Sequence, residues 1–384
     1  MGRQREAPSF SSSQRGGGKA GRNTAKSGFN RQTNFFMGKI LYVGSFQEGA
    51  TVLMRLHSLT RLGHEVFPVT TQSSLAMNPW RSWADRFAVR LLGHPGDWSR
   101  ANAAMLTMAA LHRPEAVLVD KGTVIKRATL MEIKSLLPNA VLAHFNPDDP
   151  FGGYGKRGWS RFLQSLDAYD VHFVPRKVNI SEYRKRGAQR VIAEVPSWGY
   201  DPEIHQPRIP SADFRRRFAA DIGFVGNYER ERAGLITAMG ASGLQVRVVG
   251  QLPQHAIGSN VLYTRDFVRD EDYAMSLQCF KIALCFLRKN NRDLHTSRSV
   301  EIPACGAFML AERTSEHAAL FEEDREAAFF SSTEELLDKA RFYLSNDALR
   351  RKIAEAGRMR CERSGYSNDE VMRRRCASMG LPPA

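Results

Sequence analysis

Short apolar runs alternate with amphipathic stretches along most of this chain, and that alternation constrains its fold more than any other feature. Apolar runs separated by stretches of helical period are typical of parallel sheets whose strands are covered by helices on both faces. One series of such runs lies between residues 39 and 194, and a second between residues 221 and 330. The sequence therefore predicts an α/β fold with two doubly wound parallel sheets.

The first series contains the predicted strands 39–43, 65–69, 116–119, 140–144, 171–174 and 191–194. Its predicted helices are 50–62, 99–111, 124–136 and 158–166, with an irregular or helical insertion at 78–96. The second series contains the predicted strands 221–225, 245–249, 261–263, 280–286, 307–311 and 327–330, and helices at 229–241 and 270–278. Helices 333–345, 348–363 and 368–379 are predicted to close the chain.

Proline and glycine residues near 196–210 mark the boundary between the two series. We expect a basic tail at 1–36, a first Rossmann-like domain at 37–196, a second at 197–365, and a C-terminal helix and tail at 366–384. The N-terminal tail has almost no aliphatic residues, so burial cannot offset the entropy of ordering it, and we predict that it is disordered. Because Met37 opens the first strand, we expect the native chain to start there.

Composition indicates a cytoplasmic protein. No apolar run approaches the roughly 18–20 residues that span a bilayer, and the N-terminus is polar, unlike a secretory signal. The five cysteines have no metal-ligand spacing, and their odd number favours reduced thiols. We expect no metal site and no cofactor.

The chain carries a net charge of +15, and its first 36 residues contribute +6, from seven Lys and Arg against one Glu. Other basic residues cluster at 184–190, 215–217, 350–352 and 373–375. Such clusters are either solvated helix faces or a peripheral contact with an anionic membrane. No nucleic-acid-binding motif accompanies them, so nucleic acid is not an expected partner.

The most informative motif is the stretch 293–312, in which a polar loop leads into a short helix that carries Arg298 and Glu301. Free N–H groups at a helix start attract anions, and a glutamate just inside the helix can accept hydrogen bonds from sugar hydroxyls. Gly306 ends this helix as an ordinary cap. The same residues also suit a helix with no ligand, since an acidic first turn stabilises any helix.

Polar residues follow other predicted strands at the same edge, where ligands of parallel sheets bind. In the second series these are Gly226, Asn227, Arg232 and Arg288; Gly226 lets a backbone approach closely, and Arg232 could clamp phosphates. They could equally be turn glycines and solvated helix charges.

In the first series the corresponding residues are Gly44, Ser45, His144, Asp148 and Asp149. Gly44 and Ser45 resemble a phosphate- or sugar-binding turn, and with His144 we expect them to face a sugar; alternatively, the glycine only serves the tight strand-to-helix turn. Adjacent carboxylates repel, so we expect a raised pKa for Asp148 or Asp149 and a role as base or hydroxyl anchor. The alternative is turn chemistry, which Asn-Pro and Asp-Pro favour.

The stretch 298–312, RSVEIPACGAFMLAE, resembles the signature of CgeB-type (spore-maturation-protein-like) glycosyltransferases, relatives of the group-1 family. Supporting stretches are Phe224-Val-Gly226 with Arg232 six residues on, 321–329 and 336–357, with 146–150 and 200–202 also similar. The resemblance covers most of residues 37–375 and is stronger in the C-terminal half.

This resemblance implies a GT-B fold, in which two Rossmann-like domains face each other across a cleft. The first domain, 37–196, with Gly44, Ser45 and His144, is then the expected acceptor side, and the second, 197–365, the donor side. The resemblance also implies a metal-independent, retaining glycosyl transfer from a nucleotide-diphosphate sugar, the expected partner, to an acceptor that could be a glycan, lipid, protein or small molecule. By the same resemblance Glu301 binds the ribose hydroxyls, and Thr296, Ser297 and Arg232 hold the pyrophosphate.

Departures from the group-1 pattern also follow from the resemblance. Asp293 stands where group-1 enzymes often carry the first Glu of a Glu-x7-Glu pair, so Asp293 joins Asp148 and Asp149 as a candidate catalytic carboxylate. Asn227 occupies the expected Arg position, and Arg232 the Lys position. These departures keep two alternatives open, a non-catalytic nucleotide-sugar-binding module and a nucleotide-sugar epimerase.

Overall fold

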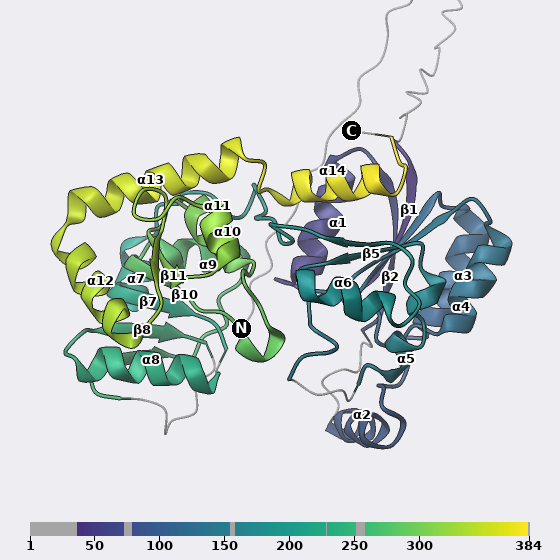
Figure 1. The fold of residues 1–384 in the computed structure, drawn as a ribbon, viewed down its shortest axis with the longest axis horizontal. Helices are drawn as coiled ribbons and strands as arrows, with labels where there is room; N and C mark the ends of the chain where they lie inside the picture. The colour runs from purple at the N-terminus through teal and green to yellow at the C-terminus, as the bar shows by residue number, and fades with distance from the viewer. Residues whose placement is uncertain (1–36, 73–78, 154–157, 228, 251–257, 383–384) are drawn as a thin grey trace, which may run out of the picture. The chain divides into compact units, whose positions relative to one another are not determined.

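The computed structural model in Figure 1 describes residues 37–72, 79–153, 158–227, 229–250 and 258–382, and for 79–82 it describes the backbone alone. The predicted disordered tail, 1–36, lies outside the described residues.

The first sheet is parallel throughout, in the order β2-β1-β3-β4-β5-β6. Its strands are β1 (Lys39–Gly44), β2 (Glu65–Thr70), β3 (Ala116–Asp120), β4 (Val141–Phe145), β5 (Val171–Val174) and β6 (Val191–Ala193). Its helices are α1 (Thr51–Arg61), α2 (Pro79–Leu92), α3 (Ala101–His112), α4 (Arg127–Leu136), α5 (Ser160–Leu163), α6 (Lys177–Arg184) and the 3-10 turn η1 (Leu166–Ala168).

The second sheet is also parallel throughout, in the order β12-β11-β10-β7-β8-β9. Its strands are β7 (Ala220–Val225), β8 (Val246–Val249), β9 (Val261–Thr264), β10 (Phe280–Cys285), β11 (Met309–Glu312) and β12 (Ala328–Phe330). Its helices are α7 (Ala212–Phe218), α8 (Arg230–Ala241), α9 (Asp270–Leu277), α10 (Arg298–Ala304), α11 (Ser315–Leu320), α12 (Thr333–Ser345), α13 (Asp347–Arg363) and the 3-10 turn η3 (Lys289–Asn291).

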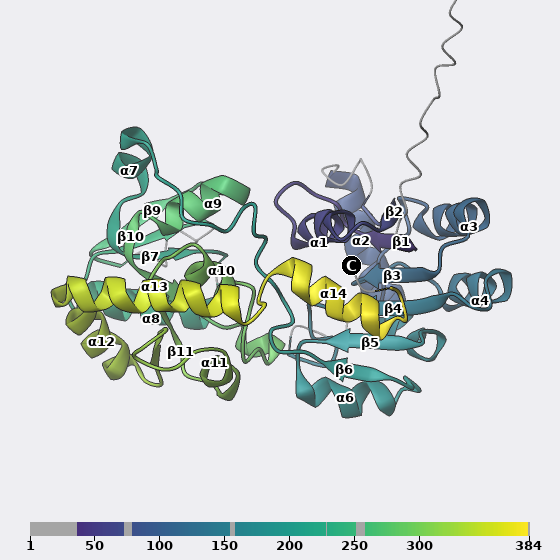
Figure 2. The same ribbon diagram turned by 90° about the horizontal axis from the view of Figure 1, so that it is seen from above.

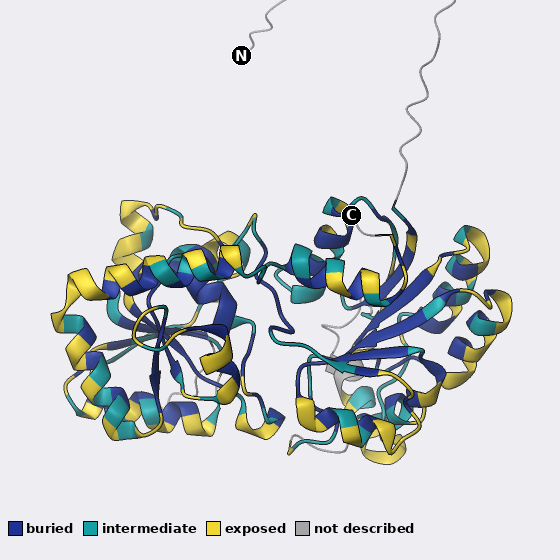
Figure 3. Ribbon diagram, turned by 45° about the horizontal axis from the view of Figure 1, so that its top comes forward, coloured by how far each residue is buried: buried dark blue, intermediate teal, exposed yellow. Residues whose placement is uncertain are grey.

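The inner strands of both sheets are buried on both faces, as Figure 3 shows by the dark strands beneath helices with exposed outer faces, whereas the edge strands β2 and β9 are only partly buried. In β1, Leu41 and Val43 belong to the core on one face, and Ile40 and Tyr42 to the core on the other. This alternation follows from the strand period of two, and burial on both faces explains why the strands read as continuous apolar runs.

The last helix, α14 (Asn368–Ser378), packs on α1 of the first sheet, although α13 before it packs on α10 of the second (Figures 1 and 2). Its Met372 and Cys376 lie in the same core as Tyr42. The Arg375 guanidinium, fully buried, lies 3.9 Å from the Phe145 ring centroid and is paired with Glu194. Residues near both described ends of the chain therefore contribute to the hydrophobic core of the first sheet.

The predicted strands are confirmed, with bounds that shift by at most two residues. The insertion at 78–96 contains the helix α2, and the expected helix 158–166 is the shorter α5 followed by η1. The prediction missed α6, α7 and α11, because each is short and two of them are rich in charged residues that leave no clear apolar stripe.

All five cysteines are buried and unpaired. In the clusters 215–217, 350–352 and 373–375, seven of the nine cations have acidic partners: Arg216 with Asp213, Arg217 with Asp266, Arg350 and Arg351 with Asp347, Arg373 and Arg374 with Glu370, and Arg375 with Glu194. Paired charges of this kind favour solvated helix faces. Within the described ranges, the helices are too short or too polar to cross a bilayer.

Candidate functional site

A cavity of about 250 Å³ lies where β7 and β8 end and α10 begins. We predicted eight residues for the donor, Gly226, Asn227, Arg232, Arg288, Thr296, Ser297, Arg298 and Glu301. Five of them line this cavity, namely Gly226, Asn227, Ser297, Arg298 and Glu301. The remaining wall includes Gly49, Thr51 and Met54 at the start of α1, and His205, Asp270 and Tyr273. The structure therefore brings together residues that are far apart in sequence at the strand ends, where parallel sheets bind ligands.

Glu301 is the buried carboxylate of this cavity. The Tyr273 hydroxyl donates a hydrogen bond of 3.0 Å to Glu301 Oε2. Burial, followed by the charge of Glu301, raises the pKa of Tyr273 well above its ordinary value, so this hydroxyl remains a donor. This hydrogen bond holds the carboxylate through Oε2, and Oε1 is available to accept a hydrogen bond from a ligand hydroxyl.

His205 lies beside the second oxygen of Glu301. Its Nδ1 accepts the backbone N–H of Asp201 at 2.9 Å, which places the ring proton on Nε2. That Nε2 lies 3.9 Å from Glu301 Oε1 and has no hydrogen-bond partner within the described protein. His205 and Tyr273 are site residues that the sequence analysis missed, and the only signal in the sequence was the nearby 200–202 stretch of the family resemblance.

Arg269 and Arg298 line the cavity, and Arg232 lies beside Arg298. Arg298 donates to the Val225 carbonyl at 2.8 Å and lies 5.8 Å from the Phe224 ring centroid, while Arg232 lies 5.7 Å from the same centroid. Burial, and then the charges of Arg298 and Arg288, lower the pKa of Arg232. Among the described residues neither Arg232 nor Arg298 forms an ion pair, so their charges are available to a ligand phosphate, while Asp266, Asp270 and Glu301 line other parts of the same cavity.

Of the two predicted arginines Arg232 and Arg298, only Arg298 lines the cavity. Arg232 is buried behind the wall, where it donates to the Asn227 and Leu287 carbonyls at 3.4 Å. Thr296 is also buried, and its backbone N–H donates to Ser299 Oγ at 2.9 Å. Arg288 pairs with Asp148 and Glu229. These three residues support the site from outside the cavity.

Gly226 is required by close packing. A Cβ added there would lie 2.8 Å from Arg298 Nη2 and 2.8 Å from Phe224 Cζ. At Gly250, a Cβ would lie 2.2 Å from the Gly226 carbonyl oxygen. Because neither turn has room for a side chain, the backbone of both turns forms the cavity wall.

The expectation of a raised pKa at Asp148 or Asp149 is wrong. Burial alone would raise both values, but Lys121 and Arg288 hold the pKa of Asp148 below its ordinary value, and Arg292 does the same for Asp149. Arg292 Nε lies 2.6 Å from Asp149 Oδ2, and Lys121 Nζ 2.7 Å from Asp148 Oδ2. Both carboxylates are therefore ionised members of ion pairs with lowered pKa values, whereas the expected base would have a raised pKa.

Asp293 is buried and forms an ion pair with Arg176, whose Nε donates to Asp293 Oδ1 at 2.9 Å. Burial raises its pKa, and Arg176 opposes that rise. Asp293 does not line the cavity next to Glu301. It instead joins the 288–293 loop to the start of α6.

His144 is a core residue and not part of the acceptor side. It is fully buried, its ring centroid lies 4.5 Å from that of Phe162, and burial followed by His172 lowers its pKa well below the ordinary value. Alternate residues of a strand point to opposite faces of the sheet, and the sequence alone does not determine which set faces the core. His295 is likewise structural: it accepts from Ser197 N at 3.0 Å and contacts Glu316.

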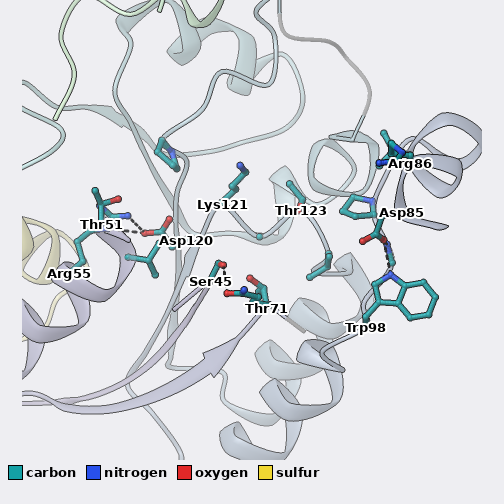
Figure 4. Close-up of a pocket in the computed structure, with 18 of the residues that line it drawn as sticks. Ser45, Thr51, Arg55, Thr71, Asp85, Arg86, Trp98, Asp120, Lys121 and Thr123 are labelled. Atoms are coloured by element: carbon teal, nitrogen blue, oxygen red, sulfur yellow. Dashed lines mark hydrogen bonds and ion pairs between the residues drawn. The ribbon is translucent and has the colours of Figure 1, made fainter. Parts of the chain in front are cut away.

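A second cavity, of about 850 Å³, lies in the first sheet's half of the chain (Figure 4). Ser45 lines it, and Gly44 packs beneath it against Val52 and Asp120. At its floor Arg55 Nη2 pairs with Asp120 Oδ2 at 2.6 Å, and its rim carries Arg86 and Trp98. Polar and aromatic groups at the ends of β1 and β3 suit a hydroxylated ligand.

Within the described residues, no group of three or more His, Cys, Asp and Glu side chains could hold a metal ion.

Residues 230–377, which are less than half of the chain, match a family model described as "Glycosyl transferase-like". Comparison with the curated proteins finds no match.

Solved structures of similar fold cover most of the chain. Sucrose-phosphate synthase from Thermosynechococcus elongatus matches with a TM-score of 0.62 at 13% identity, covering 89% of this chain and 97% of that one. Anabaena HepE in complex with UDP-glucose gives 0.57 at 11% identity, covering 89% and 99%. A putative UDP-N-acetylglucosamine 2-epimerase from Listeria monocytogenes gives 0.54 at 13% identity, covering 88% and 95%.

The fold is GT-B. The GT-B fold predicted from the resemblance is therefore confirmed, and the matched model places a glycosyltransferase-like segment over the half that contains Glu301. The finer resemblance to CgeB-type enzymes stays a prediction.

Proposed function

We propose that this chain transfers a sugar from a nucleoside-diphosphate sugar to an acceptor. The observation that carries the proposal is the 250 Å³ cavity, where the Glu301 carboxylate and the Arg298 guanidinium line one space and Gly226 forms its wall. A carboxylate fixed by Tyr273 suits a diol, and an unpaired guanidinium suits a diphosphate. The glycosyltransferase-like model and the UDP-glucose complex of HepE support a sugar nucleotide as the ligand.

The arrangement also supports a mechanism. The diphosphate that leaves during transfer carries the developing negative charge, and Arg298, reinforced by the field of Arg232 behind it, would stabilise that charge. We propose that these cations perform the task without a metal ion or cofactor, with retention at the anomeric carbon. The acceptor would enter through the 850 Å³ cavity, which Ser45 lines.

Calorimetric titration of UDP, GDP, ADP and dTDP into the full chain tests the proposal. We expect selective binding of one diphosphate and at least tenfold weaker binding by Glu301→Ala. The matched control is Glu322→Ala, which removes an exposed carboxylate that pairs with Arg325 outside the cavity. Absence of binding by all four diphosphates would overturn the proposal.

Incubation with the sugar nucleotide alone separates the transferase from the two alternatives. An epimerase would convert the donor without an acceptor, and a transferase would at most hydrolyse it slowly. Tight binding with neither conversion nor transfer across a broad acceptor screen would favour a binding module.

A further inference from the structure

The helix α2 carries an exposed apolar stripe. Trp83, Phe87 and Leu91 are 57%, 54% and 69% exposed, and their spacing of four residues places them on one face. Leu92 beside them is also exposed, and the Trp83 and Phe87 rings stack with centroids 5.7 Å apart. Elsewhere in the described part of the chain, exposed large apolar residues are scattered over other elements. A contiguous patch of this kind marks an interaction surface.

The neighbouring face of α2 lines the 850 Å³ cavity through Asp85, Arg86, Val89 and Arg90. At 100° per residue, Arg86 and Arg90 lie between the apolar stripe and the residues that face deepest into the cavity. The carboxylate of Asp85 accepts from Trp98 Nε1 at 2.7 Å and from Gly96 N at 3.1 Å. The helix therefore combines an apolar face, a basic flank and a cavity wall.

We propose that the outer face of α2 docks on an anionic lipid surface. The aromatic and leucine side chains would enter the boundary between head groups and acyl chains, and Arg86 and Arg90 would meet lipid phosphates. The positive charges of the two arginines also favour a bilayer over a second copy of this chain as the partner of this face. A symmetric dimer across the stripe would bring like charges together, whereas an anionic surface neutralises them.

Docking in this way would place the opening of the 850 Å³ cavity at the level of the head groups. The acceptor would then be an amphiphile whose polar head enters the cavity while its hydrocarbon chain stays in the bilayer. This statement about the acceptor rests on the proposed function, whereas the lipid contact of α2 stands without it.

Vesicle co-sedimentation of the full chain tests the lipid contact. The vesicles are equal parts phosphatidylglycerol and phosphatidylcholine, or phosphatidylcholine alone. We expect the wild type to bind the anionic vesicles, and the variant Trp83→Ser/Phe87→Ser/Leu91→Ser to bind them at least tenfold less tightly. Arg86→Gln and Arg90→Gln should each weaken binding about fivefold. All variants keep the basic N-terminal tail, so the tail cannot explain a difference between them.

The matched control is Leu111→Ser/Phe342→Ser, which removes two exposed apolar side chains from α3 and α12. It should bind vesicles like the wild type. Three results would overturn the proposal: equal binding by the α2 triple variant, equal binding to vesicles without anionic lipid, or self-association of the wild type that the triple variant loses. Brominated lipid should also quench tryptophan fluorescence of the wild type more than that of Trp83→Phe.

The lipid contact of α2 can be tested separately from the proposed function. The α2 triple variant should bind the nucleoside diphosphate as the wild type does, since α2 does not line the smaller cavity. Vesicle binding without any nucleotide binding would contradict the proposed function and leave the lipid contact standing.

Discussion

The Tyr273 hydroxyl and the Glu301 carboxylate form a hydrogen bond of 3.0 Å at the wall of the smaller cavity. This bond links α9 to α10 and orients the carboxylate that we assign to the ribose hydroxyls. The ring of His205 packs edge-on against Tyr273, with centroids 5.7 Å apart, and completes the support.

Tyr273→Phe should weaken nucleoside-diphosphate binding about tenfold, because one hydrogen bond to a charged group contributes about 1.5 kcal/mol. Calorimetry measures the affinity. Tyr343→Phe is the matched control, because its hydroxyl donates to Asp324 at 2.7 Å and neither residue lines the cavity. An equal loss in both variants would show that the effect is not local to the site.

Gly226→Ala should weaken binding of the diphosphate more than binding of the nucleoside. The added Cβ would lie 2.8 Å from Arg298 Nη2, so it would displace this guanidinium. We expect a loss of tenfold or more for the diphosphate in calorimetric titration. The control is Gly234→Ala in α8, where a Cβ meets nothing within 4 Å. That control should gain about 0.5–1 kcal/mol of stability, as Gly-to-Ala changes in helices do.

Arg292→Met should destabilise the fold by about 3 kcal/mol, because it leaves the buried Asp149 carboxylate without its partner. Urea denaturation measures the free energy of unfolding. The control is Arg341→Met, since Arg341 is exposed and lies 3.9 Å from Asp338, and its loss should cost less than about 0.5 kcal/mol. Similar costs for the two variants would contradict the structural role of the Arg292 pair.

The stability of this chain should fall as the pH drops from 6.5 toward 4. Burial lowers the pKa of His172 and of His317 to about 4, whereas the unfolded chain protonates them near 6.5. Between those values the unfolded state binds more protons, so the stabilisation is complete above pH 6.5 and is lost on acidification.

From pH 7 to pH 5 the expected loss is about 2 kcal/mol for each of these two histidines. Urea denaturation at pH 7, 6 and 5 measures it, and His172→Gln should reduce the fall by about 2 kcal/mol. A fall of the same size in the variant would contradict the assignment to His172.

The basic clusters show how much the sequence leaves open. For residues 350–352 and 373–375 it allowed either solvated helix faces or an anionic partner, and most of their arginines pair with Asp347 or Glu370 on the same helices, which favours solvated faces. Pairs three or four residues apart were readable from the helical period. The stripe on α2 was not readable, because apolar residues at that spacing predict a buried face unless the tertiary structure leaves it uncovered.

The sequence by itself determined the two parallel sheets and their strands, because short continuous apolar runs alternated with amphipathic helical stretches, as strands covered on both faces require. It also predicted Glu301, Arg298 and Gly226 as site residues, through the order of loop, helix and strand around them, and these three line one cavity. Only the tertiary structure decided which polar residues are accessible. His144 entered the core, Asp149 an ion pair with Arg292, and His205 the cavity wall, since the register of each strand and the path of each loop fix which way a side chain points.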